Sequence, residues 1–218
     1  MARTYTLDTK AAIEANNHSN FINQTGKYIG MIKACYYDKN QNGTESVNIL
    51  FESRDSKEAP LLTIYTHNAQ GEQLMGYNTF NALMTCCKVK QTTWSNEAVE
   101  VYNFNTKQNE KQTKEVCTEL KNKAVGLVLR QEEYQNNSGE IKTKIILHAP
   151  FEASTELMAN EILGRVTQPT ALASIMEWIA KEPIKKMKVN NQQGNYQVSQ
   201  QYQKPSNTND LEDEDIPF

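Results

Sequence analysis

Alternation of apolar and polar side chains predicts five β-strands along this chain. Each run is rich in β-branched and aromatic residues and is bounded by turn residues. The strands are expected at 26–38, 46–53, 61–67, 123–134 and 141–148. The last two are joined by the polar turn Asn136-Asn-Ser-Gly139, and together they form the clearest β-hairpin of the sequence.

The same alternation sorts the strand residues onto two faces. The residues expected to face inward in the later strands are Val47, Ile49, Phe51, Leu62, Ile64, Val125, Leu127, Leu129, Ile141, Thr143, Ile145 and Leu147. In the first strand, one face carries Tyr28, Ile32, Ala34 and Tyr36, and the other carries Lys27, Ile29, Met31, Lys33, Cys35 and Tyr37. We interpret the lysine-bearing face as outward. The reverse assignment stays open, because Met31 and Cys35 share that face.

Helical periodicity predicts three helices in the body of the chain. The first is expected at 77–87 with Asn78 as its cap, and its apolar stripe is Phe80, Leu83, Met84 and Cys87. The second begins at the capping residue Ser154 and ends near Gly164, and the third has Pro169 in its first turn and ends at Pro183. The apolar stripe of the third helix is Leu172, Ile175, Met176 and Ile179.

The region 89–118 is the hardest to interpret. The pattern permits a further strand at 98–104 and favours a polar loop at 105–114, and Trp94 falls in a polar stretch before them. At the other end of the chain, residues 1–24 predict an arm or a short helix.

The order of three strands, a helix and a hairpin is the order of an OB-type five-stranded barrel. The expected fold class is therefore mainly β with helices (α+β): a five-stranded OB-fold barrel with C-terminal helices and a disordered acidic tail. This domain should occupy 25–187.

Two polar segments follow the expected domain. In 188–209, 11 of 22 residues are Asn or Gln, which is typical of a disordered linker. In 210–218, five carboxylates precede Ile216, Pro217 and Phe218. The whole chain has 23 basic and 26 acidic residues and a net charge of −3, so without these five acids the remainder is mildly basic.

The segment 210–218 permits two interpretations. An acidic run of this kind is commonly a solubility tail. The apolar ending favours a docking segment instead, because the Phe218 ring can fill a pocket while its α-carboxylate meets a cation.

Two sequence motifs resemble a known family. The segment Asp213-Glu-Asp-Ile-Pro-Phe218 is similar to the C-terminal tip of bacterial and phage single-stranded DNA-binding proteins. The body resembles the OB-fold members that phages encode, in Gly26-Lys-Tyr28 and Val125-Gly-Leu-Val-Leu-Arg-Gln-Glu-Glu-Tyr134. The N-terminal pattern of the bacterial housekeeping members is absent. The resemblance therefore points to a phage or prophage member and covers roughly 20–182.

The resemblance implies a protein that coats and protects single-stranded DNA in replication, recombination and repair. It implies recruitment of partner enzymes of these processes through Asp213, Glu214, Asp215, Ile216, Pro217 and Phe218. It also implies a location in the bacterial cytoplasm, at the nucleoid, and it leaves the oligomeric state open, a homo-oligomer included.

A single-strand binder needs cations that follow the phosphates and rings on which bases stack. The outward-facing sets of the predicted strands, together with Trp94, contain both kinds of side chain. The candidate DNA-binding residues are Lys27, Lys33, Tyr37, Tyr65, His67, Trp94, Arg130, Lys142 and Lys144. Taken singly, each ring could instead pack in the core and each lysine could be an ordinary surface charge.

Other classes of function find less support in the sequence. The four cysteines form no C-x-x-C pair and lie far from the histidines, so neither a metal site nor a cofactor is expected. No signal peptide and no membrane-spanning apolar run is visible, and reduced thiols suit the cytoplasm. No enzyme motif appears, so no catalytic residue is expected. The alternatives left open are a recombination mediator or annealing protein, an adaptor that does not bind DNA, and, with least support, a nuclease.

Overall fold

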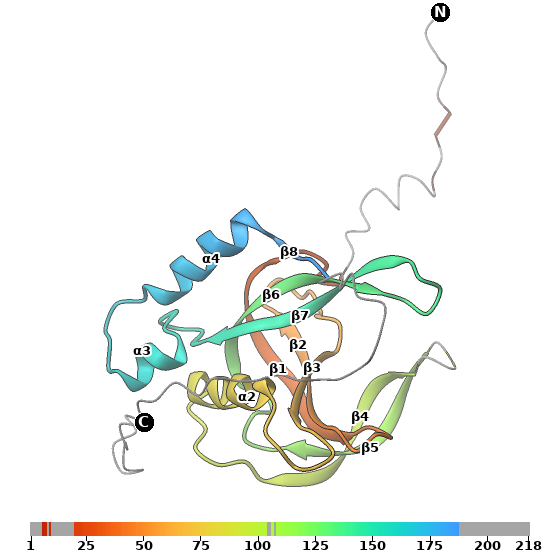
Figure 1. Cartoon of the computed structure of the whole chain (residues 1–218), viewed down its shortest axis with the longest axis horizontal. Coiled ribbons are helices and arrows are strands. Elements are labelled where there is room, and N and C mark those ends of the chain that lie inside the picture. Colours follow the sequence, from red (N-terminus) through yellow and green to blue (C-terminus); the bar gives the residue numbers. More distant parts are fainter. Residues whose placement is uncertain (1–5, 8, 10–19, 104–105, 107, 188–218) are drawn as a thin grey trace, which may run out of the picture.

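The computed structural model describes residues 6, 7, 9, 20–103, 106 and 108–187 (Figure 1). Most of the predicted N-terminal arm lies outside the described residues. The predicted linker 188–209 and the acidic segment 210–218 lie wholly outside them.

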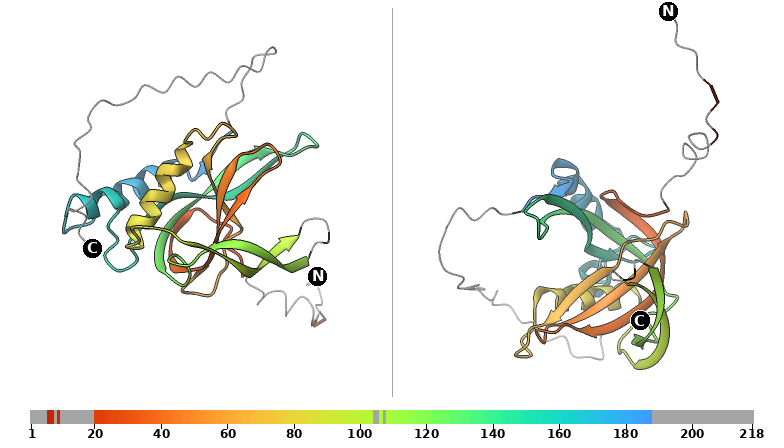
Figure 2. Two further views of the ribbon diagram at one scale, coloured as in Figure 1. Left: turned by 90° about the horizontal axis from the view of Figure 1, so that it is seen from below. Right: turned by 90° about the vertical axis from the view of Figure 1, so that its right-hand side faces the viewer.

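In the described part of the chain, eight strands form one sheet, and the fold is mainly β with a few helices, as predicted. The strands are β1 (Gly26–Lys39), β2 (Glu45–Ser53), β3 (Leu62–His67), β4 (Trp94–Asn103), β5 (Gln108–Cys117), β6 (Ala124–Gln135), β7 (Ile141–Phe151) and β8 (Ile184–Lys185). The helices are α2 (Met75–Cys86), α3 (Ala159–Leu163) and α4 (Ala171–Lys181). The helices lie toward one end of the molecule and the tips of the β4–β5 and β6–β7 hairpins toward the other (Figures 1 and 2).

The long strand β1 connects all parts of the sheet. One of its edges pairs with β2. On its other edge, Gly26–Met31 pair with β6, and Tyr36 and Tyr37 pair with β5. Between these two partners, Ile32 bonds to the loop before β6, donating to the Lys123 carbonyl at 2.9 Å and accepting from the Asn122 N–H at 2.7 Å. β1 therefore passes from one neighbour to the next at Ile32.

A β-bulge at this point changes which side chains face the core. The β1–β2 register shifts between Ile32 and Ala34. A bulge adds a residue to one strand and so reverses the alternation beyond it. As a result Ile32 and Cys35 are both buried in the main core, while Ala34 and Tyr36 lie in a second, smaller core. The prediction of Ile32, Ala34 and Tyr36 on one face is therefore wrong.

The main core lies between the concave face of the sheet and α2. It contains the predicted inward residues of β2, β3 and β6, which are Val47, Ile49, Phe51, Leu62, Ile64, Val125, Leu127 and Leu129. From β7, Ile145 is buried in the core and Leu147 packs against it, whereas Ile141 and Thr143 are exposed. The distal half of the β6–β7 hairpin therefore extends beyond the core.

The sheet is open on the side of α2. The strand order runs from β3 through β2 and β1 to β6 and β7, and no ladder between β3 and β7 is formed within the described residues. These two end strands nevertheless lie near each other, and α2 packs against both. Phe80, Leu83 and Cys86 of α2 are buried in the main core.

The β4–β5 hairpin corrects the interpretation of 89–118. The strand that the pattern permits near 98–104 is found as β4, but 105–114 is not a loop, because most of it belongs to β5. The ladder is continuous from Trp94 opposite Cys117 to Asn103 opposite Gln108. Eight of the ten side chains of β5 are polar and none of these eight is buried, so the strand has no apolar alternation to reveal it. Val99, Val101 and Val116 of this hairpin form the second core with Ala34 and Tyr36.

The helix boundaries differ from the prediction at their starts. Helix α2 begins after Leu74, so Asn78 is not its cap, and α3 begins after Met158 instead of Ser154. Pro169 precedes the cap residue Thr170 of α4. The predicted apolar stripe of α4 is confirmed. Leu172 and Ile179 are buried against β6 and β7 (Val128, Ala149 and Phe151), and Ile175 and Met176 pack beside them.

A buried carboxylate joins α3 to the start of α4. The Glu161 side chain is 5% exposed, and its Oε1 accepts hydrogen bonds from the Thr170 N–H at 2.8 Å, the Ala171 N–H at 2.9 Å and the Thr170 hydroxyl at 3.0 Å. Its Oε2 accepts from the Met158 N–H at 2.9 Å. Thr170 makes no side-chain cap of its own, so Glu161 satisfies the first N–H groups of α4.

Acidification should weaken the hydrogen bonds by which Glu161 joins α3 to the start of α4. Burial alone would raise the pKa of Glu161, but the backbone N–H groups of Met158, Ala171 and Thr170 lower it to about 2. Its folded pKa lies below its usual value of 4.5, so its stabilising contribution is present above pH 4.5 and is lost as the pH falls toward 2. Glu161→Gln should lower the free energy of unfolding by about 1–3 kcal/mol at neutral pH. In denaturant titrations, this deficit should shrink toward pH 2. A deficit that stays the same across this range would contradict the account.

The close approach of β1 to β2 requires glycine at position 30. A Cβ at Gly30 would lie 2.1 Å from the Glu52 carbonyl oxygen and 2.7 Å from the Ser53 Cα. We expect Gly30→Ala to destabilise the fold by about 1–3 kcal/mol and to lower Tm by roughly 2–12 °C in a thermal melt. Gly26→Ala is the matched control, because its nearest contact would be an ordinary 3.4 Å to the Tyr28 ring. Equal melting temperatures for the two variants would show that the strands can separate at little cost.

Candidate nucleic-acid interface

Three of the nine candidate residues gather around Glu45, at the ends of β1 and β3. The rings of Tyr37 and Trp94 meet edge to face, with centroids 6.3 Å apart. Burial raises the pKa of Tyr37, and the charge and hydrogen bond of Glu45 raise it further. The His67 Nδ1 lies 3.8 Å from the Glu45 carboxylate. The Glu45 carboxylate therefore lies near both Tyr37 and His67, and Trp94 joins this group through its contact with the Tyr37 ring.

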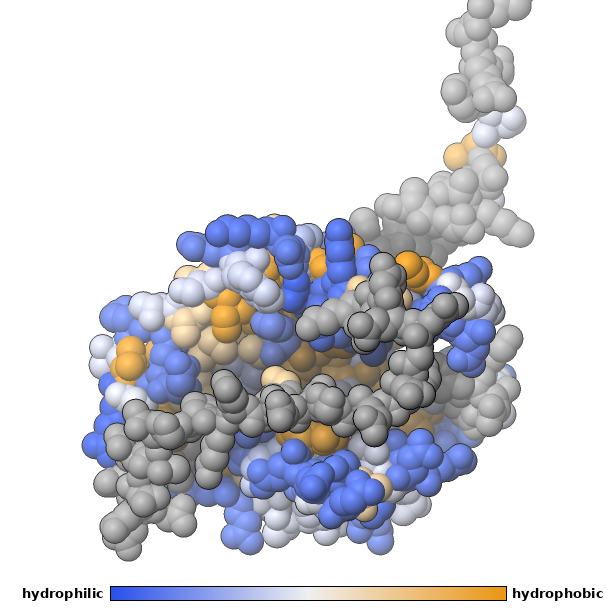
Figure 3. All heavy atoms as spheres, viewed as in Figure 1, coloured by the Kyte–Doolittle hydropathy of each residue, from blue (hydrophilic) through white to orange (hydrophobic). Residues whose placement is uncertain are grey.

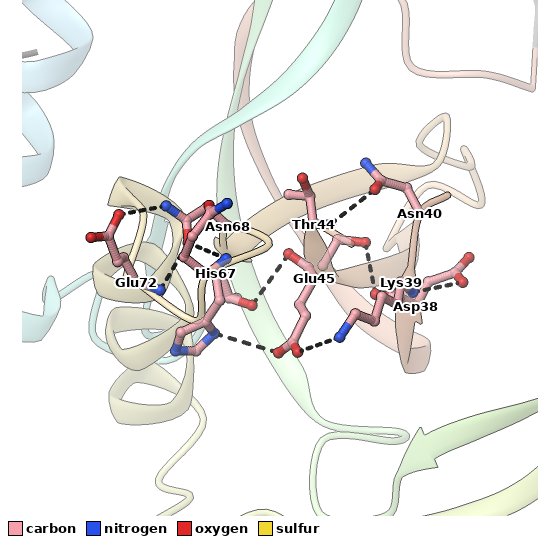
Figure 4. Close-up of polar contacts among 11 residues, drawn as sticks. Asp38, Lys39, Asn40, Thr44, Glu45, His67, Asn68 and Glu72 are labelled. Carbon is pink, nitrogen blue, oxygen red and sulfur yellow. Dashed lines mark hydrogen bonds and ion pairs between the residues drawn. The ribbon is translucent and has the colours of Figure 1, made fainter. Parts of the chain in front are cut away.

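Two polar turns lie on either side of the Glu45 and His67 side chains, as Figure 4 shows. In the β1–β2 turn, the Asn40 Oδ1 accepts from the Thr44 N–H at 2.9 Å. In the turn after β3, the Asn68 Oδ1 accepts from the Glu72 N–H at 2.9 Å. The turns lie side by side, because a Cβ at Gly43 would be 3.1 Å from that of Ala69. Between them, the Glu45 carboxylate lies between His67 and Lys39, whose Nζ is 3.3 Å away.

His67 does not share the outward face of Tyr65, as the alternation of β3 had predicted. The register of β2 against β3 shifts between Glu45 and Ser46, so His67 pairs with Glu45 and Tyr65 pairs with Ser46. His67 is half-buried and its ring meets that of Tyr77 edge to face at 5.6 Å. Its Nδ1 is buried and has no hydrogen-bond partner among the described residues, which leaves it facing the Glu45 carboxylate.

Tyr65 stands on the opposite face of the β2–β3 pair. Its side chain is 53% exposed, and its cross-strand neighbour Ser46 continues a polar row along that face. In the next row, the Thr63 hydroxyl donates to the Asn48 Oδ1 at 2.7 Å. Lys114 of β5 lies over the Tyr36 ring at 5.5 Å on the same side. The structure therefore offers Tyr65 as an exposed ring separate from the Tyr37–Trp94 pair, while Lys114 on the same side is half-buried and paired with Asp38 at 3.4 Å.

The two candidate lysines of β1 are exposed, as predicted, and both are ion-paired. The Lys27 Nζ is 2.6 Å from Glu156, and the Lys33 Nζ is 3.0 Å from Glu52. Exposed pairs of this kind contribute little to stability, so a phosphate can compete for either lysine.

A third group of candidates lies on the distal half of the β6–β7 hairpin. Lys142 and Lys144 are exposed, and each is near a carboxylate, Glu140 at 3.3 Å and Glu132 at 3.2 Å. Lys144 also lies over the Tyr134 ring at 5.8 Å. Tyr134 was not among the predicted residues, although its position opposite Lys142 in the expected hairpin could have indicated it.

A pocket of about 400 Å³ opens beside this hairpin, between the end strands of the sheet. Phe21, Leu61 and Ile145 give it apolar walls, and Lys144 and Gln131 supply its polar groups. The combination of an exposed ring, an apolar wall and a cation is suited to a planar, negatively charged ligand.

Arg130 is placed differently from the prediction of an outward cation. It is only 3% exposed, because α4 covers the outer face of β6 at this point. Its Nη2 donates to the Glu182 carbonyl at 2.6 Å, and its guanidinium lies 4.5 Å from the centroid of the Trp178 ring. The strand pattern was right that Arg130 points away from the core, but it could not show the helix above it.

The remaining reactive groups are sequestered. All four cysteines are buried and free. Burial raises the pKa of Cys35 well above its usual range and the pKa values of Cys86 and Cys87 to about 12, which keeps these thiols protonated and unreactive. Among the described residues, no group of three or more His, Cys, Asp or Glu side chains is arranged to hold a metal ion. No helix in the described part is long and apolar enough to cross a membrane.

Comparison with known proteins assigns no family, since no protein-family model matches the chain and no curated protein matches it in sequence.

On the face seen in Figure 3, hydrophilic residues predominate and hydrophobic ones form small patches between them. The candidate interface consists of the partly buried Tyr37–Trp94 pair, the Tyr65 face of β2–β3, the exposed Lys27 and Lys33 of β1, and the lysine-bearing β6–β7 hairpin.

Proposed function

We propose that this chain binds single-stranded DNA with little sequence preference. In this proposal it coats and protects the strand in replication, recombination and repair, in a bacterial cytoplasm. The observation that carries the proposal is the strand order β3-β2-β1-β6-β7 with a helix after β3, in combination with exposed rings and cations on these strands. The sequence resemblance to phage-encoded single-stranded DNA-binding proteins supports the same function.

The finer fold in this proposal is an OB-type barrel of β1, β2, β3, β6 and β7. An OB barrel is a partly open five-stranded Greek-key barrel, and it binds oligonucleotides on its second and third strands and the loops beside them. The nearness of β3 to β7, and the packing of α2 against both, support this assignment. The β4–β5 hairpin is then an addition between the helix and the fourth barrel strand.

The exposed groups fit the chemistry of a single strand. Tyr65 lies on the third barrel strand, while Tyr37, Trp94 and His67 lie near the β1–β2 turn. Lys142 and Lys144 lie on the hairpin of the last two barrel strands. Rings can stack with any base and lysines follow the phosphates, so binding of this kind is tolerant of sequence and sensitive to salt.

The first test is a titration with poly(dT) and with duplex DNA at several salt concentrations. We expect preference for the single strand. The logarithm of the affinity should fall with the logarithm of the salt concentration, with a slope of about −0.7 per phosphate neutralised. No binding at low salt would favour an adaptor, and faster pairing of complementary strands would favour an annealing protein. Strand cleavage with added Mg²⁺ or Mn²⁺ would favour a nuclease.

Two variants in the same titration separate stacking from charge. Tyr65→Ala should weaken binding by roughly 1–3 kcal/mol and leave the salt slope unchanged. Lys144→Ala should cause a smaller loss and a shallower slope. Both side chains are exposed, so neither variant should change Tm. If Tyr65→Ala lowers Tm and spares binding, the ring packs within the protein and does not stack on a base.

We further propose that 210–218 docks replication, recombination or repair enzymes. Phe218 is the anchor in this proposal, and the carboxylates steer the encounter. The acids also compete with DNA for the cations of the domain, which the length of 188–209 would permit.

Deletion of 210–218 should leave Tm unchanged, keep or modestly raise the affinity for poly(dT), most visibly at low salt, and abolish capture of partner enzymes from a bacterial lysate. Phe218→Ala is the matched variant. It should abolish capture while barely changing DNA affinity, because the charges remain. If the truncated protein captures the same enzymes, 210–218 is a solubility tail.

A further inference from the structure

The Trp178 side chain of α4 is about half exposed to solvent. The residue is 49% exposed, although tryptophan normally buries most of its large apolar area. It is not part of the apolar stripe of α4, which packs on β6 and β7 through Leu172 and Ile179. The Trp178 ring instead contacts side chains of β6 and β7.

Two sheet residues hold the ring. The Arg130 guanidinium from β6 lies 4.5 Å from the ring centroid. The His148 ring from β7 is nearly parallel to the indole, at 22° with centroids 5.7 Å apart. A cation close to the face of an indole is held by the ring quadrupole. Together these contacts fix the Trp178 side chain on a rigid base.

The charge of Arg130 is only partly neutralised. Its Nη2 donates to a carbonyl, that of Glu182, and its Nε has no hydrogen-bond partner among the described residues although it is buried. The nearest carboxylate, also of Glu182, is 3.9 Å away, and that side chain is 74% exposed. A guanidinium in these surroundings keeps the site electropositive.

Other cations reinforce this field. Burial lowers the pKa of His148, and the nearby charges of Arg130 and Lys185 lower it further, so Lys185 acts on the same site. Lys185 also pairs with Glu132 at 2.5 Å, and Lys181 and Lys186 are exposed in the same segment. Segment 177–186 also carries the glutamates Glu177 and Glu182, so its three lysines give it a net charge of +1 beside the exposed ring.

We propose that Trp178 is a stacking platform for a base of single-stranded DNA, with the adjacent phosphates bound by Lys185 and its neighbouring lysines. A planar base bearing a negative phosphate matches a flat ring backed by a cation better than an apolar peptide does. The inference rests on the proposed function and extends it, since it adds α4 to the DNA-binding surface of the strands. Arg130 then acts as a positioning residue, because it supports the platform from beneath without touching DNA.

The two tryptophans of the chain make this directly testable. In the Trp94→Phe variant, all indole fluorescence comes from Trp178. We expect poly(dT) to quench this emission and to protect it from iodide, with the midpoint of the titration equal to that of binding measured by anisotropy. The reciprocal variant, Trp178→Phe, reports Trp94 alone and retains a ring at position 178.

Affinity measurements complete the test. Trp178→Ala should weaken poly(dT) binding by about 5- to 150-fold, the effect of losing one stacked base, and Trp178→Phe should recover most of that affinity. Circular dichroism and Tm show whether α4 stays in place in Trp178→Ala. If α4 is lost, the fluorescence of the Trp94→Phe variant decides the question.

Two outcomes overturn the inference and can be told apart. If poly(dT) binds but Trp178 emission and iodide quenching do not change, and Trp178→Ala binds as tightly as the native protein, the platform is wrong while the proposed function stands. If the native protein does not bind poly(dT) at all, both fall together. Protection of Trp178 by a protein partner and not by poly(dT) would identify the site as a protein-docking surface.

Discussion

The structure depends on a single strand, β1, that pairs with three neighbouring strands. A β-strand has only two edges, and β1 pairs one of them with β2 from Gly30 to Lys39. The other edge must pass from β6 to β5 within a few residues, which a regular, flat strand cannot do without losing hydrogen bonds. The bulge after Ile32 solves this problem, because it bends the strand while the Asn122–Lys123 backbone satisfies Ile32 at the change of partner. The two cores on opposite faces of the sheet follow from this bend.

The elements themselves could be predicted from the sequence, since each strand of the main core carries its own apolar alternation. What alternation cannot show is a change of register. At Ala34 and at His67, bulges move the side chain to the other face, and a bulge leaves no periodic signal. β5 escaped prediction for a different reason: its ladder with β4 is formed by backbone groups, and its exposed polar side chains resemble those of a loop.

The candidate site could be predicted only in part, and Arg130 explains why. Its position on β6 correctly indicates a side chain that points away from the main core, but exposure depends on what covers the strand. The cover is α4, which is fixed far along the chain by the carboxylate of Glu161. Because of this tertiary packing, Arg130 is buried beneath α4 and contacts the Trp178 ring, although it was expected to be a surface cation. No local pattern of the sequence singles out Trp178.

The sheet packs on two separate hydrophobic cores, a main core and a smaller second core. The β4–β5 hairpin packs on the rest of the molecule through its own small group, Ala34, Tyr36 and the three valines, while Cys117 at the end of β5 belongs to the main core. Insertions, deletions and substitutions in its outer half therefore leave the packing of Ile32, Phe51 and Leu127 undisturbed. The outer half of the hairpin can therefore change in length and surface chemistry without changing the strands that pack on the main core.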